Sequence, residues 1–182
     1  MNNVTFPTLR SPRLSLIEIN SQHLDDLFEI LSDPMVRRYI DATPHRTTVE
    51  TMRKILFYKR LFIKIRGIQW GITLHNSAEL LGSIGYTKQP EKNVIKLSFD
   101  LKQKHWNKGI MTEALECVMT YVAAKKGIHK VTAYAFSDNL ASQKVLLKNG
   151  FTPQDELPNE LLLDNQVRIL LSFSLKTAQN AL

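Results

Sequence analysis

The chain has 182 residues, of which 43% are hydrophobic and 23% are charged, and this composition is typical of one globular domain and excludes a disordered chain. Lys and Arg total 24 against 17 Asp and Glu, so the formal net charge is +7, which favours anionic partners such as nucleic acid, a membrane surface or a phosphate-rich small molecule. The single cysteine, Cys117, excludes an internal disulfide and a cysteine-based metal cluster, and it fits a reducing, cytoplasmic setting. No apolar run is long enough to span a membrane, and no two histidines are three or four residues apart, so we expect neither a membrane partner nor a metal site.

The first half of the chain predicts helices followed by strands. Ser21 is expected to cap the first helix, and Thr47 or Thr48 together with Glu50 is expected to open the second. The predicted elements are a strand over 13–19, a helix over 23–31, a turn over 41–44, a helix from 47 or 48 to about 62, and strands over 68–74 and 79–86.

The second half alternates strands with helices. Gly127 and Gly150 are expected to end two of the helices. The predicted elements are a hairpin loop over 87–93, a strand over 94–101, a helix over about 110–126, a strand over 130–137, a helix over 139–149, a strand from 151 and a last strand over 167–175. This mixed order predicts an α/β (α+β) fold around one sheet, and without a visible linker we expect a single domain over 1–182.

The segment between the predicted strand 94–101 and the helix after it favours phosphate binding. Unpaired amides at a helix start, with the positive end of the helix dipole behind them, attract an anion. Gly109 lets the backbone approach that anion, Thr112 can add a hydroxyl, and Lys102, Lys104 and Lys108 raise the local potential. Alone, the pattern also fits an ordinary strand–loop–helix with a solvated basic loop, and there is no Gly-x-Gly-x-x-Gly or Walker loop.

Several motifs in the right order resemble the GNAT acetyltransferases. Trp106-Asn-Lys-Gly-Ile-Met111 occupies their pyrophosphate loop, Gln/Arg-x-x-Gly-x-Gly/Ala. The Trp start, the following Thr-Glu-Ala and the motifs at 13–14, 81–85 and 149–151 look like the branch of the ribosomal-protein N-terminal acetyltransferases. The resemblance covers about residues 12–175. It departs from the family pattern at Trp106, at Asn107 and Met111, where small residues are usual, and at Lys96, where many relatives have a strand Glu.

The resemblance implies a GNAT-like single domain with its core at about 10–176. Its mostly antiparallel mixed sheet would have about seven strands flanked by helices, with the fourth and fifth strands splayed apart. Acetyl-coenzyme A would be the co-substrate, with no metal. Backbone groups of Phe99 and Leu101 would pair with the pantetheine arm, amides of 107–112 would hold the pyrophosphate, and Asn139 would contact the arm near its thiol. The implied cofactor-binding residues are Phe99, Leu101, Trp106, Asn107, Lys108, Gly109, Ile110, Met111, Thr112, Asn139 and Ser142.

The resemblance also bears on the proton donor. Many relatives protonate the leaving thiolate with a Tyr seven residues after the Asn, and that position is Leu146 here. Ser142 is therefore the expected catalytic residue, as proton donor or hydrogen-bond partner of the thiolate; alternatively it only supports the first helical turn. Asp100 and Glu113 are the nearby acids for a general base, and Glu113 fits a structural role in a first helical turn.

The missing strand Glu favours a weakly basic acceptor. An α-amine has a pKa of roughly 7.7–8.0 and a lysine amine one near 10.4, so the α-amine is substantially neutral at cell pH and needs less help from a base. The leading hypothesis is therefore acetylation of a protein N-terminal α-amine by a monomer or homodimer, without a DNA partner. The alternatives are a small-molecule amine acetyltransferase (polyamine, antibiotic or amino acid) and a non-catalytic basic RNA- or ribosome-associated binding module.

Overall fold

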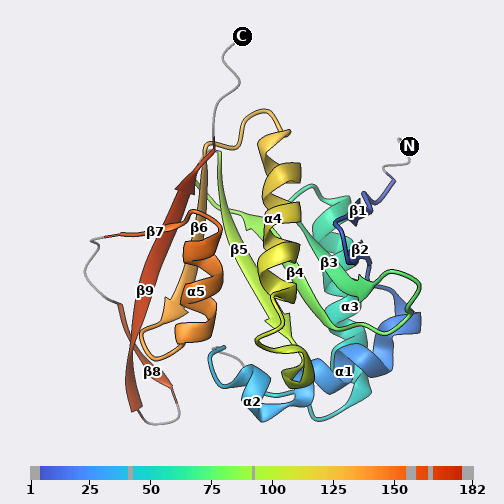
Figure 1. Cartoon of the computed structure of the whole chain (residues 1–182). Helices are drawn as coiled ribbons and strands as arrows, with labels where there is room; N and C mark the ends of the chain where they lie inside the picture. Colours follow the sequence, from blue (N-terminus) through green and yellow to red (C-terminus); the bar gives the residue numbers. More distant parts are fainter. Residues whose placement is uncertain (1–4, 41–42, 92, 155–158, 164–165, 178–182) are drawn as a thin grey trace.

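The computed structural model describes residues 5–40, 43–91, 93–154, 159–163 and 166–177. Within them, nine strands form one sheet in the order β1-β2-β3-β4-β5-β6-β9-β7, and β8 pairs with β9 (Figure 1). The elements in chain order are β1 (Leu9–Arg10), β2 (Leu14–Glu18), η1 (Ser21–His23), α1 (Leu24–Ser32), α2 (Pro34–Arg37), α3 (Thr48–Ile63), β3 (Gly67–Leu74), β4 (Gly82–Lys88), β5 (Val94–Leu101), η2 (Gln103–His105), α4 (Ile110–Ala123), β6 (Lys130–Phe136), α5 (Leu140–Lys148), β7 (Thr152–Pro153), β8 (Asn159–Leu163) and β9 (Gln166–Lys176).

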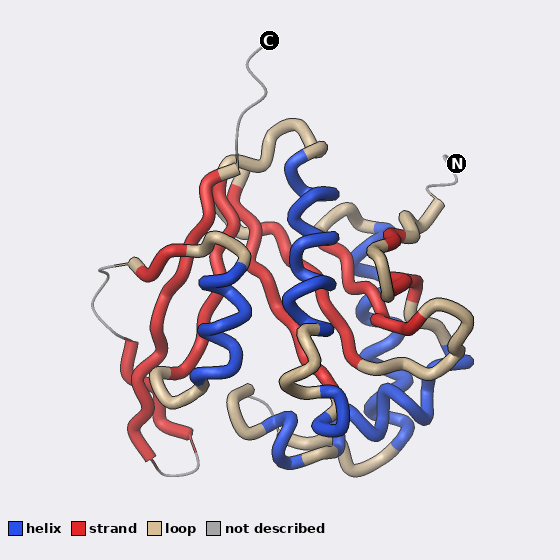
Figure 2. Tube along the Cα trace, viewed as in Figure 1, coloured by secondary structure: helices blue, strands red, loops and turns tan. Residues whose placement is uncertain are grey.

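Helices cover both faces of the sheet (Figure 2). On one face, Val118 and Val122 of α4 are fully buried in the larger core, which also contains Trp70 of β3. On the other face, α1 and α3 bury a smaller core that includes Ile30 and Tyr58. The sheet is therefore the middle of three layers, and each face has its own apolar core.

The sheet opens between β5 and β6, its one parallel pair. Their pairing ends at Lys96 and Thr132, although β5 continues to Leu101 and β6 to Phe136. The expected splay of the fourth and fifth predicted strands, which are β5 and β6 here, is confirmed. Among the described residues, no strand pairs with the last five residues of β5 on the side of β6.

The backbone groups on that edge follow from the antiparallel pairing of β4 with β5. The Lys102 amide donates to the Leu81 carbonyl at 2.9 Å, one step beyond the pair of Gly82 with Leu101. Hydrogen-bonded and non-hydrogen-bonded pairs alternate along an antiparallel ladder. Phe99 and Leu101 therefore point their amides and carbonyls away from β4, toward the open side.

Most predicted elements are present with shifted ends. The helix predicted from 47 or 48 is α3, with Thr47 as its cap and Glu50 completing a capping box. The predicted helix over 23–31 is α1, whose N-cap is His23 without a side-chain cap, so the assignment of that cap to Ser21 was wrong. Ser21 instead begins the 3-10 helix η1, which Asn20 caps by accepting from the Gln22 amide. Helix α4 ends at Ala123, three residues before the expected end.

Other differences arise from side-chain contacts and pairings of distant segments. Residues 79–81 were predicted as strand, but the Leu80 amide donates to the Asp26 side chain, and the strand begins at Gly82. Short α2 follows Asp33, which caps it, and Pro34 occupies its first position, where proline is tolerated. The sheet has more strands than the seven expected because the two-residue strand β1 and the strand β8 join it, while the strand predicted from 151 is the two-residue β7. The turn predicted over 41–44 lies partly outside the described residues.

Candidate functional site

The N-terminus of α4 has no side-chain cap. Its N-cap residue is Gly109, in the left-handed conformation with φ 73°, and Asn107 is also left-handed with φ 59°. By contrast, α3 is capped by Thr47 and α5 by Asn139. First-turn amides that no side chain caps, together with the positive end of the helix dipole, form a binding site for an anion.

The side chains around these amides anchor the loop to the core. Ile110 and Met111 are 5% and 6% exposed and belong to the larger core, so only their backbone faces the loop. The Trp106 indole nitrogen donates to the Leu101 carbonyl at 2.7 Å, which joins the loop to the end of β5. Met111, which departs from the small residue of the family pattern, is thus accommodated as a core residue.

Arg13, which directly precedes β2, lies beside this loop. The sequence motifs assigned no role to this basic residue. Its Nη1 donates to the Lys108 carbonyl at 3.2 Å, and its Nε pairs with Glu113 Oε2 at 2.6 Å. A Cβ added at Gly109 would lie 3.5 Å from Arg13 Nη2. Hydrogen bonds from Ser11 and Arg13 lower the pKa of Glu113 despite its partial burial. Glu113 therefore has the expected structural role, and the half-exposed Arg13 adds positive charge beside the uncapped amides.

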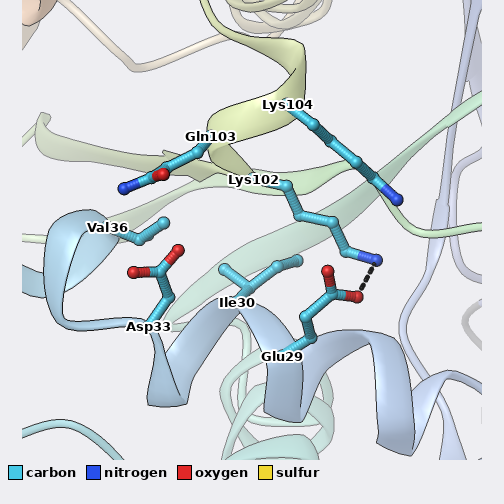
Figure 3. A pocket seen from close by; sticks show the side chains of 7 residues that line it. All are labelled: Glu29, Ile30, Asp33, Val36, Lys102, Gln103 and Lys104. Atoms are coloured by element: carbon cyan, nitrogen blue, oxygen red, sulfur yellow. Dashed lines mark ion pairs between the residues drawn. The ribbon is translucent and has the colours of Figure 1, made fainter.

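The expectation that Lys102 and Lys104 raise the potential of the loop was wrong. Lys102 Nζ is buried and pairs with Asp26 at 2.7 Å, Glu29 at 2.6 Å and Glu79 at 3.4 Å, while Lys104 pairs with Glu79 at 2.6 Å. These carboxylates neutralise both charges. Figure 3 shows Lys102 reaching toward Glu29 of α1. A hollow of about 460 Å³ lies here, lined by Glu29, Ile30, Asp33, Val36, Lys102, Gln103 and Lys104.

Helix α5 presents the second predicted motif. The Asn139 side-chain oxygen accepts from the Ser142 amide at 3.1 Å and so caps the helix. Among the described residues, the Ser142 hydroxyl has no hydrogen-bond partner. At the other end of α5, the Asn149 side chain donates to the Thr112 carbonyl at 3.3 Å, which ties this helix to the first turn of α4.

Asp100 lies on the face of the sheet opposite α4. Its Oδ1 accepts from the Ser83 amide at 3.0 Å and from the Ser83 hydroxyl at 2.9 Å, and Gln69 Nε2 donates to that hydroxyl at 2.8 Å. Burial raises the pKa of Asp100, while the Ser83 hydrogen bonds and the charge of Arg37 act against the rise. The sequence left the face of Asp100 open, and the structure places it under α3. Of the two acids named for a base, Asp100 is the one without a salt bridge.

The described residues contain no group of three or more His, Cys, Asp or Glu placed to hold a metal ion. None of the described helices is both long enough and apolar enough to cross a membrane. The donor set at the α4 loop is instead amides and a guanidinium, which suits a phosphate group. The open edge of β5 and this anion site lie at the two ends of one segment, 99–112. Together they fit a molecule with an amide-bearing arm and a pyrophosphate, as in coenzyme A.

Comparison with known proteins agrees with this geometry. Residues 13–152 match the sequence profile described as an acetyltransferase (GNAT) domain. The uncharacterised N-acetyltransferase YoaA of Bacillus subtilis (strain 168) is 30% identical over 153 residues, which cover 84% of this chain and 86% of that protein.

Two solved structures have the same fold. RimL, a ribosomal L7/L12 α-N-protein acetyltransferase crystallised with coenzyme A, superposes with a TM-score of 0.85 at 19% identity, covering 93% of this chain and 98% of that one. Spermidine N-acetyltransferase from Vibrio cholerae, in complex with coenzyme A and spermine, gives a TM-score of 0.79 at 11% identity, covering 92% and 97%. The profile match over most of the chain, supported by the splayed strands, shows that the protein belongs to the GNAT family of acetyl-coenzyme A-dependent N-acetyltransferases.

Proposed function

We propose that this protein acetylates the α-amine at the N-terminus of a protein. The amine nitrogen bonds to the thioester carbonyl carbon of acetyl-coenzyme A, the carbon–sulfur bond breaks, one proton leaves the nitrogen, and the thiolate gains one. The observation that carries the proposal is the free edge of β5 beside the uncapped start of α4. On this edge the amides of Phe99 and Leu101 are free to pair with the arm and to stabilise an oxyanion.

In this proposal, phosphate groups bind the loop at 106–112. The amides of Asn107, Lys108, Gly109, Ile110, Met111 and Thr112 hold the pyrophosphate, with Trp106 fixing the loop. The half-exposed Arg13 supplies charge beside them. Acetyl-coenzyme A supplies the activated acetyl group, and these residues of the chain hold the cofactor in one orientation.

The acceptor assignment depends on the scarcity of bases near the open edge. Lys96, at the position where relatives have a strand Glu, lies with its Nζ 5.0 Å from the centre of the Tyr134 ring, so this position supplies no carboxylate. Asp100 is a carboxylate of β5 itself, and its raised pKa suits it to accept a proton. An α-amine, which is substantially neutral near pH 8, needs only such a weak base or a water relay.

Ser142 is the proposed partner of the leaving thiolate. Leu146, at the usual tyrosine position, is fully buried in the larger core and has no proton to give. The Ser142 hydroxyl has no partner among the described residues, so it is available to donate. Asn139 keeps its side-chain nitrogen free for the arm while its oxygen caps α5.

The fold alone does not choose among acceptors, since RimL and the spermidine enzyme share it. The test is an acceptor screen in which free thiol release from acetyl-coenzyme A is measured with N-terminal peptides, polyamines, aminoglycosides and amino acids. We expect peptides with a free α-amine to give the largest kcat/KM. The same peptides with a blocked N-terminus and a free lysine should be inactive. Equal rates with both peptide sets, or a preference for polyamines, would contradict the proposal.

A further inference from the structure

Arg37 of α2 carries a partly buried guanidinium. Its Nε is inaccessible to solvent and makes no hydrogen bond, and the guanidinium forms no ion pair with any described carboxylate. Leaving such a donor unsatisfied inside a protein is costly, so natural proteins usually pair it. A buried guanidinium nitrogen that no protein group satisfies indicates a position where a ligand supplies the acceptor.

Lys54 of α3 adds a second unpaired charge to the same place. Its Nζ lies 5.1 Å from the centre of the Phe57 ring and 5.2 Å from that of Tyr58, and it forms no ion pair among the described residues. Burial and the nearby charge of Arg37 lower the pKa of Lys54. The two side chains thus raise the local potential together, which favours an anion between α2 and α3.

Asp100 forms the negative pole of this site. Its charge interacts with those of Arg37 and Lys54, yet neither cation approaches it within ion-pair distance. Ser83 fixes Asp100 through two hydrogen bonds, so the carboxylate cannot swing away to pair. One carboxylate and two cations are therefore grouped on one face of the sheet without forming an ion pair with one another.

The segment after α2 places this site beside the gap between β5 and β6. The Tyr39 hydroxyl donates to the Asp138 carbonyl, which follows β6, at 3.4 Å. Arg168 of β9 donates from Nη1 to the Arg38 carbonyl at 3.1 Å. Residues 38 and 39 therefore connect α2 with the end of β6 and with β9, on the other side of the gap between β5 and β6. Arg37 is the residue of α2 that directly precedes this connection. The site is on the face opposite the one that α4 covers, away from Arg13.

We propose that the acceptor carries a carboxylate close to its reacting amine, and that Arg37, assisted by Lys54, binds this carboxylate while Asp100 faces the ammonium group. Asp100 lies between Phe99 and Leu101, whose backbone groups we assign to the arm, so an amine held there is beside the thioester. The inference rests on the proposed function, in which the reacting amine is the N-terminus of a peptide. The carboxylate is then an acidic side chain at the second or third residue of that peptide. A polyamine would bring like charges against Arg37 and Lys54.

The experiment compares two acceptor pairs by kcat/KM. The first pair is Ser-Glu and Ser-Gln peptides that are otherwise identical and amidated at the C-terminus. The second pair is free serine and ethanolamine, which distinguishes an α-carboxylate from a side-chain carboxylate. Wild-type protein is compared with Arg37→Met, with Arg37→Lys, and with Lys125→Met, which removes a charge at the far end of α4, where Lys125 covers the Tyr121 ring.

We expect wild-type protein to prefer the carboxylate member of at least one pair by roughly ten- to a hundredfold, the effect of one hydrogen bond to a charged group. Arg37→Met should abolish the preference without raising the KM for acetyl-coenzyme A, Arg37→Lys should restore part of it, and Lys125→Met should leave it intact.

Equal kcat/KM within both pairs, a preference that survives Arg37→Met, or turnover with polyamines alone would overturn the inference. Peptides that react without a carboxylate preference would leave the proposed function standing and remove only this inference. A carboxylate preference seen only for serine over ethanolamine would keep this inference and contradict the proposed function.

Discussion

Arg13 and Glu113 form an ion pair of 2.6 Å that joins the start of β2 to the first turn of α4. The same guanidinium donates to the Lys108 carbonyl, so it is held against the loop proposed to bind the pyrophosphate. The pair is half-exposed on the arginine side, and exposed pairs stabilise a fold by only about 0.2–1 kcal/mol. The ion pair therefore adds little to the stability of the fold, and it holds the guanidinium beside the uncapped start of α4.

The first prediction concerns Arg13→Met. Calorimetry at low salt should show the Kd for acetyl-coenzyme A rising by about tenfold, because one charge-assisted contact is lost. The wild-type Kd should itself rise with salt, and the variant should show a smaller rise. Arg66→Met, at an exposed turn before β3, is the control and should bind normally. Unchanged affinity in Arg13→Met would remove Arg13 from the site.

The second prediction uses two glycines with similar backbones. Gly109 and Gly127 have φ of 73° and 88°, and an added Cβ would meet nothing closer than 3.5 Å and 3.7 Å respectively. Gly→Ala should cost each about 1 kcal/mol of stability, since a non-glycine residue is strained in this region. Gly109→Ala should also weaken acetyl-coenzyme A binding, and Gly109→Asp should do so far more because it adds a negative charge. Gly127→Ala should bind normally. Equal affinity losses in the two alanine variants would indicate that both glycines are only structural.

The third prediction separates catalysis from capping in α5. Ser142→Ala should lower kcat by roughly 10²-fold, the lower end for general acid catalysis, and leave the melting temperature unchanged, because only the Ser142 amide supports the helix. Asn139→Ala should lower the melting temperature, since a lost cap costs about 1 kcal/mol. A lower melting temperature with wild-type turnover in Ser142→Ala would return this serine to a structural role.

The fourth prediction concerns acid. Despite partial burial, the hydrogen bonds from Leu80 and Lys102 lower the pKa of Asp26, and those from Lys104 and Lys102 lower the pKa of Glu79. Depressed carboxyl pKa values contribute stability above the unfolded values of about 3.9 and 4.3, and this contribution is lost as pH falls through and below that range. The urea concentration at the midpoint of unfolding should therefore decrease when the pH is lowered below about 4.5. Because both carboxylates are partly exposed, the loss should be about 1 kcal/mol or less.

Lys102→Met should remove part of that pH dependence, since the Leu80 amide and Lys104 would still donate to Asp26 and Glu79. It should also cost about 3 kcal/mol at neutral pH, since it breaks a buried ion pair with several carboxylates. Lys104→Met is the control, because Lys104 is half-exposed and should cost less than 1 kcal/mol. The same acid slope in Lys102→Met and wild-type protein would contradict this account of the cluster.

Local sequence signals predicted the elements that depend on them. The capping box at Thr47 and Glu50 and the alternation over 94–101 correspond to observed element ends. Strand β8 and the shortened start of β4 could not be predicted this way. The first depends on pairing with the distant β9, and the second depends on Asp26 accepting from the Leu80 amide across 54 residues.

The cofactor loop was more predictable than the acceptor side. The uncapped start of α4 follows from Gly109, a local signal. The neutralisation of Lys102 and the grouping of Arg37, Lys54 and Asp100 require three helices and β5 to meet, so no spacing in the sequence shows them. In the sequence, Arg13 is marked only by its place in a motif that resembles the family. Its physical role depends on the contact with Lys108, 95 residues away along the chain.

The position of the acetyl group on the product distinguishes α-amine acetylation from acetylation of a lysine. A peptide with a free α-amine, an internal lysine and a glutamate at the second position is incubated with wild-type protein and acetyl-coenzyme A and then sequenced by tandem mass spectrometry. An N-terminal α-amine acetyltransferase should place the acetyl group on the N-terminal fragment alone, with thiol released in equal amount and with both signals reduced by Ser142→Ala. Acetylation on the lysine alone, or thiol release without a modified peptide, would contradict the proposed function.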